Sequence, residues 1–229
     1  MILLPVTGIA VLDHDCDKGI SRAVERDNDL SAYDPRIRAV LCPLIPVGGV
    51  VVDGGAFIGD HTVPYAEAVG PTGQVWAFEC SLPALECLAR NTAHLPQVQI
   101  VTAALDAHEH SVAVHQNWIS EACNAIAAHE VDDGIPAVPL DLFTFTRLDY
   151  VKLDLEGYEL RALRGAMQTL TQHRPLVVVE SGAQLERYGH THAELMAFMG
   201  TLGYDGERLP YQHHYHDVFD VLFTPQERA

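Results

Sequence analysis

An acidic residue and two glycines follow the apolar run of residues 50–52 at fixed spacing. Asp53, Gly55 and Gly59 form the pattern D-x-G-x-x-x-G, where a buried strand should end and a helix should begin. Glycine lets a ligand approach the backbone of such a turn, and the amides that open the next helix attract a carboxylate or a phosphate. We therefore expect a ligand site here. The alternative is a glycine-rich turn that binds nothing.

A second acid lies where a nucleoside ribose would be bound. Glu79 ends the next apolar run, 20 residues after Gly59 (79 − 59 = 20), and an acid at that place can accept hydrogen bonds from a ribose diol. Residues 54–59 match the dinucleotide pattern G-x-G-x-x-G only in part, and Asp53 would crowd a pyrophosphate. The same acid could instead attract the α-ammonium of S-adenosylmethionine.

Catalytic patterns separate these cofactors further. Neither lysine has a tyrosine four residues before it, so the Tyr-x-x-x-Lys pair of short-chain dehydrogenases is absent from the sequence. The sequence also contains no Gly-Lys pair, which excludes a P-loop. An NAD-linked oxidoreductase remains the alternative enzyme class.

Three charged residues interrupt a second apolar segment. Lys152, Asp154 and Glu156 alternate along a predicted strand, which would point all three side chains to one face. Charges in a buried strand are costly unless they are paired or used. A neutralising structural cluster is one interpretation. The other is catalysis, in which Asp154 or Glu156 removes a proton and Lys152 holds both carboxylates in place.

Strands and helices alternate from residue 49 onward, which indicates an α/β fold with a mostly parallel sheet. The predicted strands cover residues 49–53, 74–79, 98–105, 148–157 and 174–181, and a terminal pair covers 204–209 and 217–225. The predicted helices cover residues 61–70, 81–95, 158–173 and 191–203. Between residues 111 and 140 we expect one short strand and an irregular acidic segment. Residues 1–47 are expected to form a strand-like arm and helical segments that cover the site, and residues 48–229 the ligand-binding domain.

Composition narrows the possible partners and location. The net charge of −17 disfavours binding to nucleic acid or to an anionic membrane surface. The start of the chain lacks a basic n-region, and no apolar run is long enough to span a bilayer. The five cysteines form no C-x-x-C pair, so we expect reduced cysteines and a cytoplasmic protein.

The segments 50–62, 75–79 and 151–181 together resemble the FkbM family of S-adenosylmethionine-dependent methyltransferases, over roughly residues 48–182. The resemblance implies a class I methyltransferase (Rossmann-like) fold, with a mostly parallel seven-stranded sheet flanked by helices. It also implies methylation of a hydroxyl oxygen on a sugar, glycan or natural-product small molecule. The chain differs from the common family pattern at Phe57 and Cys80. A non-catalytic binding module that keeps this fold is a third alternative.

Two sets of candidate residues follow. The catalytic candidates are Asp154, Glu156 and Lys152. The candidates for binding S-adenosylmethionine are Asp53, Gly55, Phe57, Ile58, Gly59, His61, Glu79, Cys80, Ala104 and Leu105. Ala104 and Leu105 are expected against the adenine, while His61 has two interpretations, a contact with the methionine carboxylate or an exposed position.

Two weaker signals remain. His213, His214, His216 and Asp217 lie close together in the sequence, but adjacent histidines in a hairpin turn cannot all face one ion, so we expect no metal site. Asn117 and Trp118 could line an acceptor site, although a packed tryptophan is the simpler interpretation. The sequence does not identify the acceptor, the methylated atom or the oligomeric state.

Overall fold

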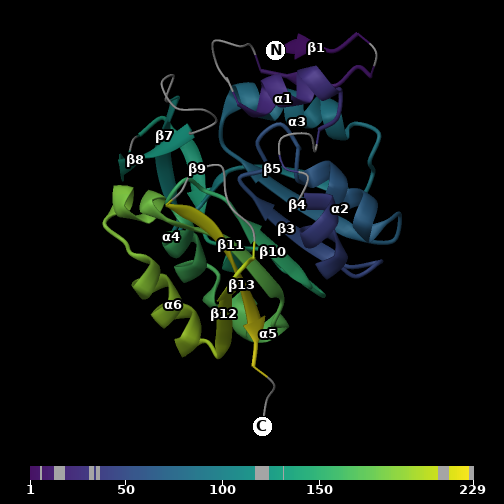
Figure 1. Ribbon diagram of the computed structural model, residues 1–229. Helices are drawn as coiled ribbons and strands as arrows, with labels where there is room; N and C mark the ends of the chain where they lie inside the picture. The colour runs from purple at the N-terminus through teal and green to yellow at the C-terminus, as the bar shows by residue number, and fades with distance from the viewer. Residues whose placement is uncertain are drawn as a thin grey trace.

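The computed structural model describes residues 1–5, 7–12, 19–30, 34, 37–116, 124–130, 132–210 and 217–226. Its centre is a seven-stranded sheet with the strand order β12-β13-β11-β10-β3-β4-β5 (Figure 1). The strands are β3 (Val50–Gly54), β4 (Gln74–Glu79), β5 (Val98–Thr102), β10 (Tyr150–Leu153), β11 (Leu176–Gly182), β12 (Tyr204–Arg208) and β13 (Val218–Pro225). Strands β11, β10, β3, β4 and β5 are parallel, and β13 and β12 join antiparallel. The predicted fold class and the terminal strand pair are confirmed.

Helices cover both faces of this sheet, which explains why its central strands are apolar without alternation. One face packs on α4 (Glu159–Arg164), α5 (Met167–His173) and α6 (His192–Thr201). The other packs on α2 (Thr62–Val69), the π-helix η1 (Ile37–Leu41) and the 3-10 helix η2 (Cys42–Leu44). The valines at 51, 52, 177, 178 and 179 are accordingly fully buried. No helix among the described residues combines the length and apolar character that crossing a bilayer requires.

The segment expected to be irregular forms a second sheet instead. Its order is β6-β9-β7-β8, with strands β6 (Ala104–Leu105), β7 (His110–Gln116), β8 (Asn124–Glu130) and β9 (Ile135–Val138). The predicted strand 98–105 was therefore too long, because Ala104 and Leu105 leave the main sheet and pair with β9. A register shift between Val112 and Val114 interrupts the β7–β8 ladder. Such a bulge removes the strict alternation that marks a strand in sequence.

The predicted helix 158–173 is divided into α4 and α5. A Cβ on Gly165 would lie 1.9 Å from the carbonyl oxygen of Asp106, so backbone from another segment lies against the helix at this point. The carbonyl of Gly165 accepts a hydrogen bond from the amide of Asp141 (2.9 Å). The Asp141 carboxylate in turn accepts the amides of Gln168 and Thr169, in the first turn of α5. Side-chain capping from a distant segment therefore starts a new helix.

The first residues form β1 (Ile2–Leu3), β2 (Ala10–Val11) and α1 (Ile20–Asp27). They pack with α3 (Leu82–Thr92) and with Phe57 and Ile58 of the glycine turn. The helical segments expected within residues 1–47 are α1 and two short helices, the π-helix η1 and the 3-10 helix η2, with Pro43 in the second. Two further 3-10 turns are η3 (Leu140–Leu142) and η4 (Ala183–Tyr188).

Two glycine substitutions test the contact that divides α4 from α5. Gly165→Ala places a methyl group against rigid backbone, and we expect it to lower the free energy of unfolding by about 2 kcal/mol. Gly200→Ala in α6 is the matched control, because a Cβ at that position would have no atom within 4 Å. The control is expected to be neutral or to stabilise by up to about 1 kcal/mol. Urea unfolding measures both, and equal effects of the two substitutions would contradict this explanation.

Candidate functional site

The predicted site residues come together at the carboxyl edge of the main sheet. Because β3, β4 and β10 run parallel, their ends meet there, and Asp53 lies directly beside Lys152 in the β3–β10 register. A cleft opens at this edge. Its walls include these predicted residues: Asp53, Gly55, Phe57, His61, Glu79, Cys80, Ala104, Leu105, Asp154 and Glu156. Ile58 is fully buried in the core, and Gly59 and Lys152 lie behind the walls.

The glycine turn has the geometry that only glycine allows at Gly55. Its φ is +82°, and a Cβ there would lie 1.9 Å from the carbonyl oxygen of Asp154. The amides of Gly55 and Ala56 both donate to the carbonyl of Phe78 at 3.0 Å. Gly59 also has a positive φ of +95°, and a Cβ at this position would lie 3.2 Å from Leu88 of α3. The turn is therefore clamped between the loop after β10, the end of β4 and α3.

Glu79 fastens this turn to the end of β4. Its carboxylate accepts the amide of Phe57 at one oxygen (2.8 Å) and the amides of Cys80 and Ser81 at the other (2.8 and 2.6 Å). The residue is 7% exposed and lines the cleft. Burial raises its pKa, although the three amide hydrogen bonds oppose that effect. The carboxylate is thus held in one orientation and keeps lone pairs for a ligand's hydroxyl groups.

Asp53 lies at the base of the cleft with 1% of its surface exposed. The hydroxyl of Thr62, the first residue of α2, donates to its carboxylate at 2.6 Å. Burial raises the pKa of Asp53 to about 6, against the opposing effects of the Thr62 hydrogen bond and of Lys152. This carboxylate therefore changes charge just below neutral pH.

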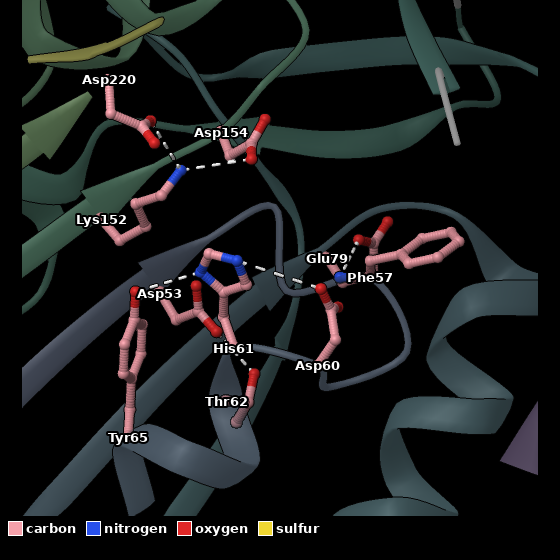
Figure 2. Close-up of polar contacts among 10 residues, drawn as sticks. All are labelled: Asp53, Phe57, Asp60, His61, Thr62, Tyr65, Glu79, Lys152, Asp154 and Asp220. Carbon is pink, nitrogen blue, oxygen red and sulfur yellow. Dashed lines mark hydrogen bonds and ion pairs between the residues drawn. The ribbon is translucent and has the colours of Figure 1, made fainter. Parts of the chain in front are cut away.

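His61 lies inside the cleft, so the interpretation of an exposed histidine is wrong. Its side chain is 15% exposed, and its Nδ1 lies 3.0 Å from the Tyr65 hydroxyl. Burial lowers the pKa of His61 to about 4, which keeps the imidazole neutral at physiological pH. Its Nε2 lies 4.0 Å from the carboxylate of Asp60 (Figure 2).

Asp60 is a cleft residue that the sequence reasoning missed. It is 6% exposed and lines the cleft. Burial raises its pKa well above the usual range, and the nearby Asp53 adds to the effect. Its position directly after the last glycine of the turn was the available signal, because this turn was already expected to border a ligand site.

The expected arrangement of the charged triplet is wrong for two of its members. Strand β10 ends at Leu153, so Asp154 and Glu156 belong to the following loop. Glu156 adopts a φ of +57°, which is uncommon outside glycine. Its carboxylate pairs with Arg187 of η4 at 3.0 Å. Both residues nevertheless line the cleft.

The ammonium of Lys152 is buried beneath this loop, with 1% of the residue exposed. It lies 3.2 Å from Asp154 and 3.8 Å from Asp220 of β13 (Figure 2). Burial opposes its charge, but Asp154, Asp220 and Glu180 outweigh that effect and raise its pKa. Burial raises the pKa of Glu180, on β11, well above the usual range, and Asp154 adds to the effect. Asp220 and Glu180 were not expected from the sequence, because each comes from a different strand.

Carboxylate oxygens of Asp154, Glu156 and Glu180 lie within 4.8 Å of one another. Oxygen ligands so spaced could hold a divalent cation, but Lys152 already provides a positive charge beside Asp154. The expectation of no metal stays a prediction.

Backbone and apolar groups form the remaining walls. Ala104 and Leu105 of β6 line the cleft beside Phe78 and Cys80, and burial raises the pKa of the Cys80 thiol.

Asn91 of α3 is a second residue that was missed. Its side-chain oxygen accepts a hydrogen bond from the backbone amide of Ala10. Its side-chain nitrogen donates to the backbone carbonyls of Ala10 and Ile58. It thereby ties the N-terminal arm to the glycine turn.

Several expectations concern residues outside the described part of the chain. The histidines at 213, 214 and 216, together with Asn117 and Trp118, fall in this group.

Comparisons with known proteins show the family through a family model and the fold through solved structures. The model of the family described as methyltransferase FkbM domain matches residues 53–205, which is more than half of the chain. No curated protein sequence matches.

Solved structures with low sequence identity share the fold. A methyltransferase FkbM from Methylobacillus flagellatus is 18% identical with a TM-score of 0.58, and the match covers 85% of this chain and 48% of that one. The chain thus spans about half the length of that protein. A magnesium protoporphyrin IX methyltransferase from Synechocystis, with bound SAM, is 11% identical with a TM-score of 0.54, and the match covers 97% of this chain and 88% of that one. An O-methyltransferase from Thermotoga maritima is 13% identical with a TM-score of 0.51, and the match covers 85% of this chain and 66% of that one.

Replacing Lys152 tests the charge balance of the site. Lys152→Met leaves Asp154 and Asp220 without their ammonium, and we expect the free energy of unfolding at pH 8 to fall by about 3 to 5 kcal/mol. Lys152 is charged at pH 5.5 and at pH 8, because its pKa is raised. In the variant the carboxylates take up protons more readily, so the loss should be smaller at pH 5.5.

Arg38→Met is the control for this substitution, because Arg38 pairs with Glu67 while both side chains are about half exposed. This substitution should lower the free energy of unfolding by less than about 1 kcal/mol. Urea unfolding at pH 5.5 and pH 8 measures the loss of stability in both variants. Equal losses for the two variants, or a larger loss of Lys152→Met at pH 5.5, would contradict this charge balance.

Proposed function

Because the chain belongs to the FkbM methyltransferase family, we propose that it transfers a methyl group from S-adenosylmethionine to a hydroxyl oxygen. The acceptor is a small molecule, a sugar or a glycan. Methyl transfer with S-adenosylmethionine follows from the family. The oxygen acceptor rests on the carboxylates of the cleft, and the similarity to an O-methyltransferase of the same fold agrees with it.

The chemistry of the cleft fits this cofactor. The carboxylates of Asp53, Asp60, Glu79, Asp154 and Glu156 line it, and no lysine or arginine appears among the described residues of its walls. S-adenosylmethionine carries an ammonium, a sulfonium and a ribose diol, which suit carboxylates. In this assignment Glu79 binds the ribose, Asp53 attracts the ammonium, and Ala104 and Leu105 lie against the adenine.

The amides of the glycine turn carry the argument against NAD. A dinucleotide needs such amides for its pyrophosphate. Here those of Gly55 and Ala56 already donate to the carbonyl of Phe78, and that of Phe57 donates to Glu79. A pyrophosphate would also lie against the buried carboxylates of Asp53 and Asp60. The engaged amides are therefore the observation that favours a phosphate-free cofactor.

The protein's part in the reaction is positioning and proton removal. The bound cofactor supplies an electrophilic methyl group on a sulfonium. The walls of the cleft align the acceptor with it, and alignment contributes much of the rate. Asp154 or Glu156 accepts the hydroxyl proton, and Lys152 fixes Asp154 through their contact at 3.2 Å. These two carboxylates at the cleft argue against a non-catalytic binding module.

The N-terminal segment 1–47 is proposed to cover this site, next to the methyltransferase domain 48–229. Ile20, the first residue of α1, lines the cleft. The Asn91 hydrogen bonds join β2 to the turn that carries Phe57 and Ile58. A cytoplasmic location stays part of the proposal.

Calorimetry with the product S-adenosylhomocysteine and with NAD tests the cofactor assignment. We expect micromolar binding of S-adenosylhomocysteine and no comparable binding of NAD. Glu79→Gln should weaken S-adenosylhomocysteine binding by about tenfold, because one oxygen acceptor becomes a donor. Glu86→Gln, an exposed change on α3, should leave binding unchanged. A preference for NAD, or no binding of S-adenosylhomocysteine, would refute the assignment.

Substitutions of the two loop carboxylates identify the base. Transfer of a labelled methyl group to a panel of hydroxyl-bearing sugars measures turnover, and binding of S-adenosylhomocysteine serves as the folding control. Removing the base should lower turnover by about 100-fold or more and leave cofactor binding intact. If Glu156→Gln keeps normal turnover while Asp154→Asn loses it, the base is Asp154. Normal turnover in both variants would remove the loop from the base role.

A further inference from the structure

The cleft has more acidic residues than the proposed contacts with S-adenosylmethionine use. Glu79 is held by three amides, and Asp53 by Thr62 with Lys152 as its neighbour in the strand register. Asp60 has no role in this assignment, although it lines the cleft with 6% of its surface exposed. A carboxylate that is buried at a ligand cleft carries a desolvation cost, which a cationic ligand can offset.

The side chains that act most strongly on the charge of Asp60 are themselves acidic. The carboxylates of Asp53 on β3, Asp154 after β10 and Asp34 before η1 act on it through space. Its contact at 4.0 Å is Nε2 of His61, which is neutral at physiological pH. No cation reaches it from its own turn.

We propose that Asp60 makes the cleft favour the sulfonium of S-adenosylmethionine over the neutral thioether of S-adenosylhomocysteine. This role rests on the proposed function and assigns to Asp60 the discrimination between substrate cofactor and product. The two molecules differ by one methyl group and one positive charge, so a carboxylate without a matching cation separates them by charge. Burial strengthens the effect, because attraction between charges grows as water is excluded.

The consequence is a bias in the catalytic cycle. Transfer of the methyl group moves the cofactor from the sulfonium to the thioether and removes the charge that Asp60 attracts. The product is then held less tightly than the substrate cofactor, so exchange of one for the other is favoured after each turnover. Burial raises the pKa of Asp60 and so favours its neutral form in the empty cleft, whereas a cation bound beside it stabilises the ionised form; the sulfonium, unlike the thioether, would provide that cation.

Calorimetry of the protein tests the proposal without an acceptor. The ligands are S-adenosylmethionine, S-adenosylhomocysteine and sinefungin, in which an amine-bearing carbon replaces the sulfonium. The wild-type protein should bind S-adenosylmethionine and sinefungin more tightly than S-adenosylhomocysteine. Asp60→Asn should lower the ratio of the two cofactor affinities by roughly tenfold, chiefly by weakening the cationic ligands.

Two controls make the outcome decisive. Asp205→Asn makes the same chemical change at an exposed position of the far edge strand β12, and it should leave the affinity ratio unchanged. Thermal unfolding without ligand shows whether Asp60→Asn remains folded, and Asp60→Glu, which restores the charge, should recover part of the ratio. Raising the salt concentration should change the wild-type ratio little, because the carboxylate is buried.

The proposal fails if S-adenosylhomocysteine binds the wild-type protein as tightly as S-adenosylmethionine. It also fails if a folded Asp60→Asn variant keeps the wild-type ratio. Failure of the proposed function looks different, since then neither cofactor form binds the wild-type protein at all.

Discussion

The buried ammonium of Lys152 is the interaction on which the rest of the site depends. It lies between Asp154 and Asp220, at 3.2 and 3.8 Å, with Glu180 acting on it from a third segment. Carboxylates gathered at one edge of a sheet repel each other, and in a buried place they lose hydration as well. One ammonium lets the loop after β10 and strands β11 and β13 approach each other there. The same contact keeps Asp154 at the wall of the cleft.

Two glycines allow the backbone to pack closely around the charged loop. The Asp154 carbonyl occupies the place of a side chain at Gly55, and the Gln184 carbonyl does the same at Gly157, where a Cβ would lie 2.1 Å away. The loop of residues 154–157 is therefore held between the glycine turn and η4. Glu156 takes its uncommon backbone conformation inside this loop. Strain of this kind persists where the surroundings determine it fully, which is typical of functional sites.

Local sequence patterns predicted the features that depend on residues close together in the chain. The apolar runs located the parallel strands, and Asp53, Gly55 and Glu79 located the cleft, because strand ends and glycine turns are short-range features. Asn91 was missed since its role depends on distant partners, whereas Asp60 was missed although its place directly after Gly59 was a local signal. The triplet prediction failed because β10 stops at Leu153, which depends on where Gly55 and Asp154 meet. The second sheet was missed because the β7–β8 pairing is irregular, with extra residues in β8 where the register shifts.

A crystal structure of the complex with S-adenosylhomocysteine tests most directly the claim that this cleft holds the cofactor. The account predicts the ribose hydroxyls within hydrogen-bond distance of the Glu79 carboxylate, with Glu79 still accepting the amides of Phe57, Cys80 and Ser81. It also predicts the adenine against Ala104 and Leu105, and the methionine end beside Asp53 and Asp60. A ligand bound outside this cleft, or a ribose without contact to Glu79, would contradict it.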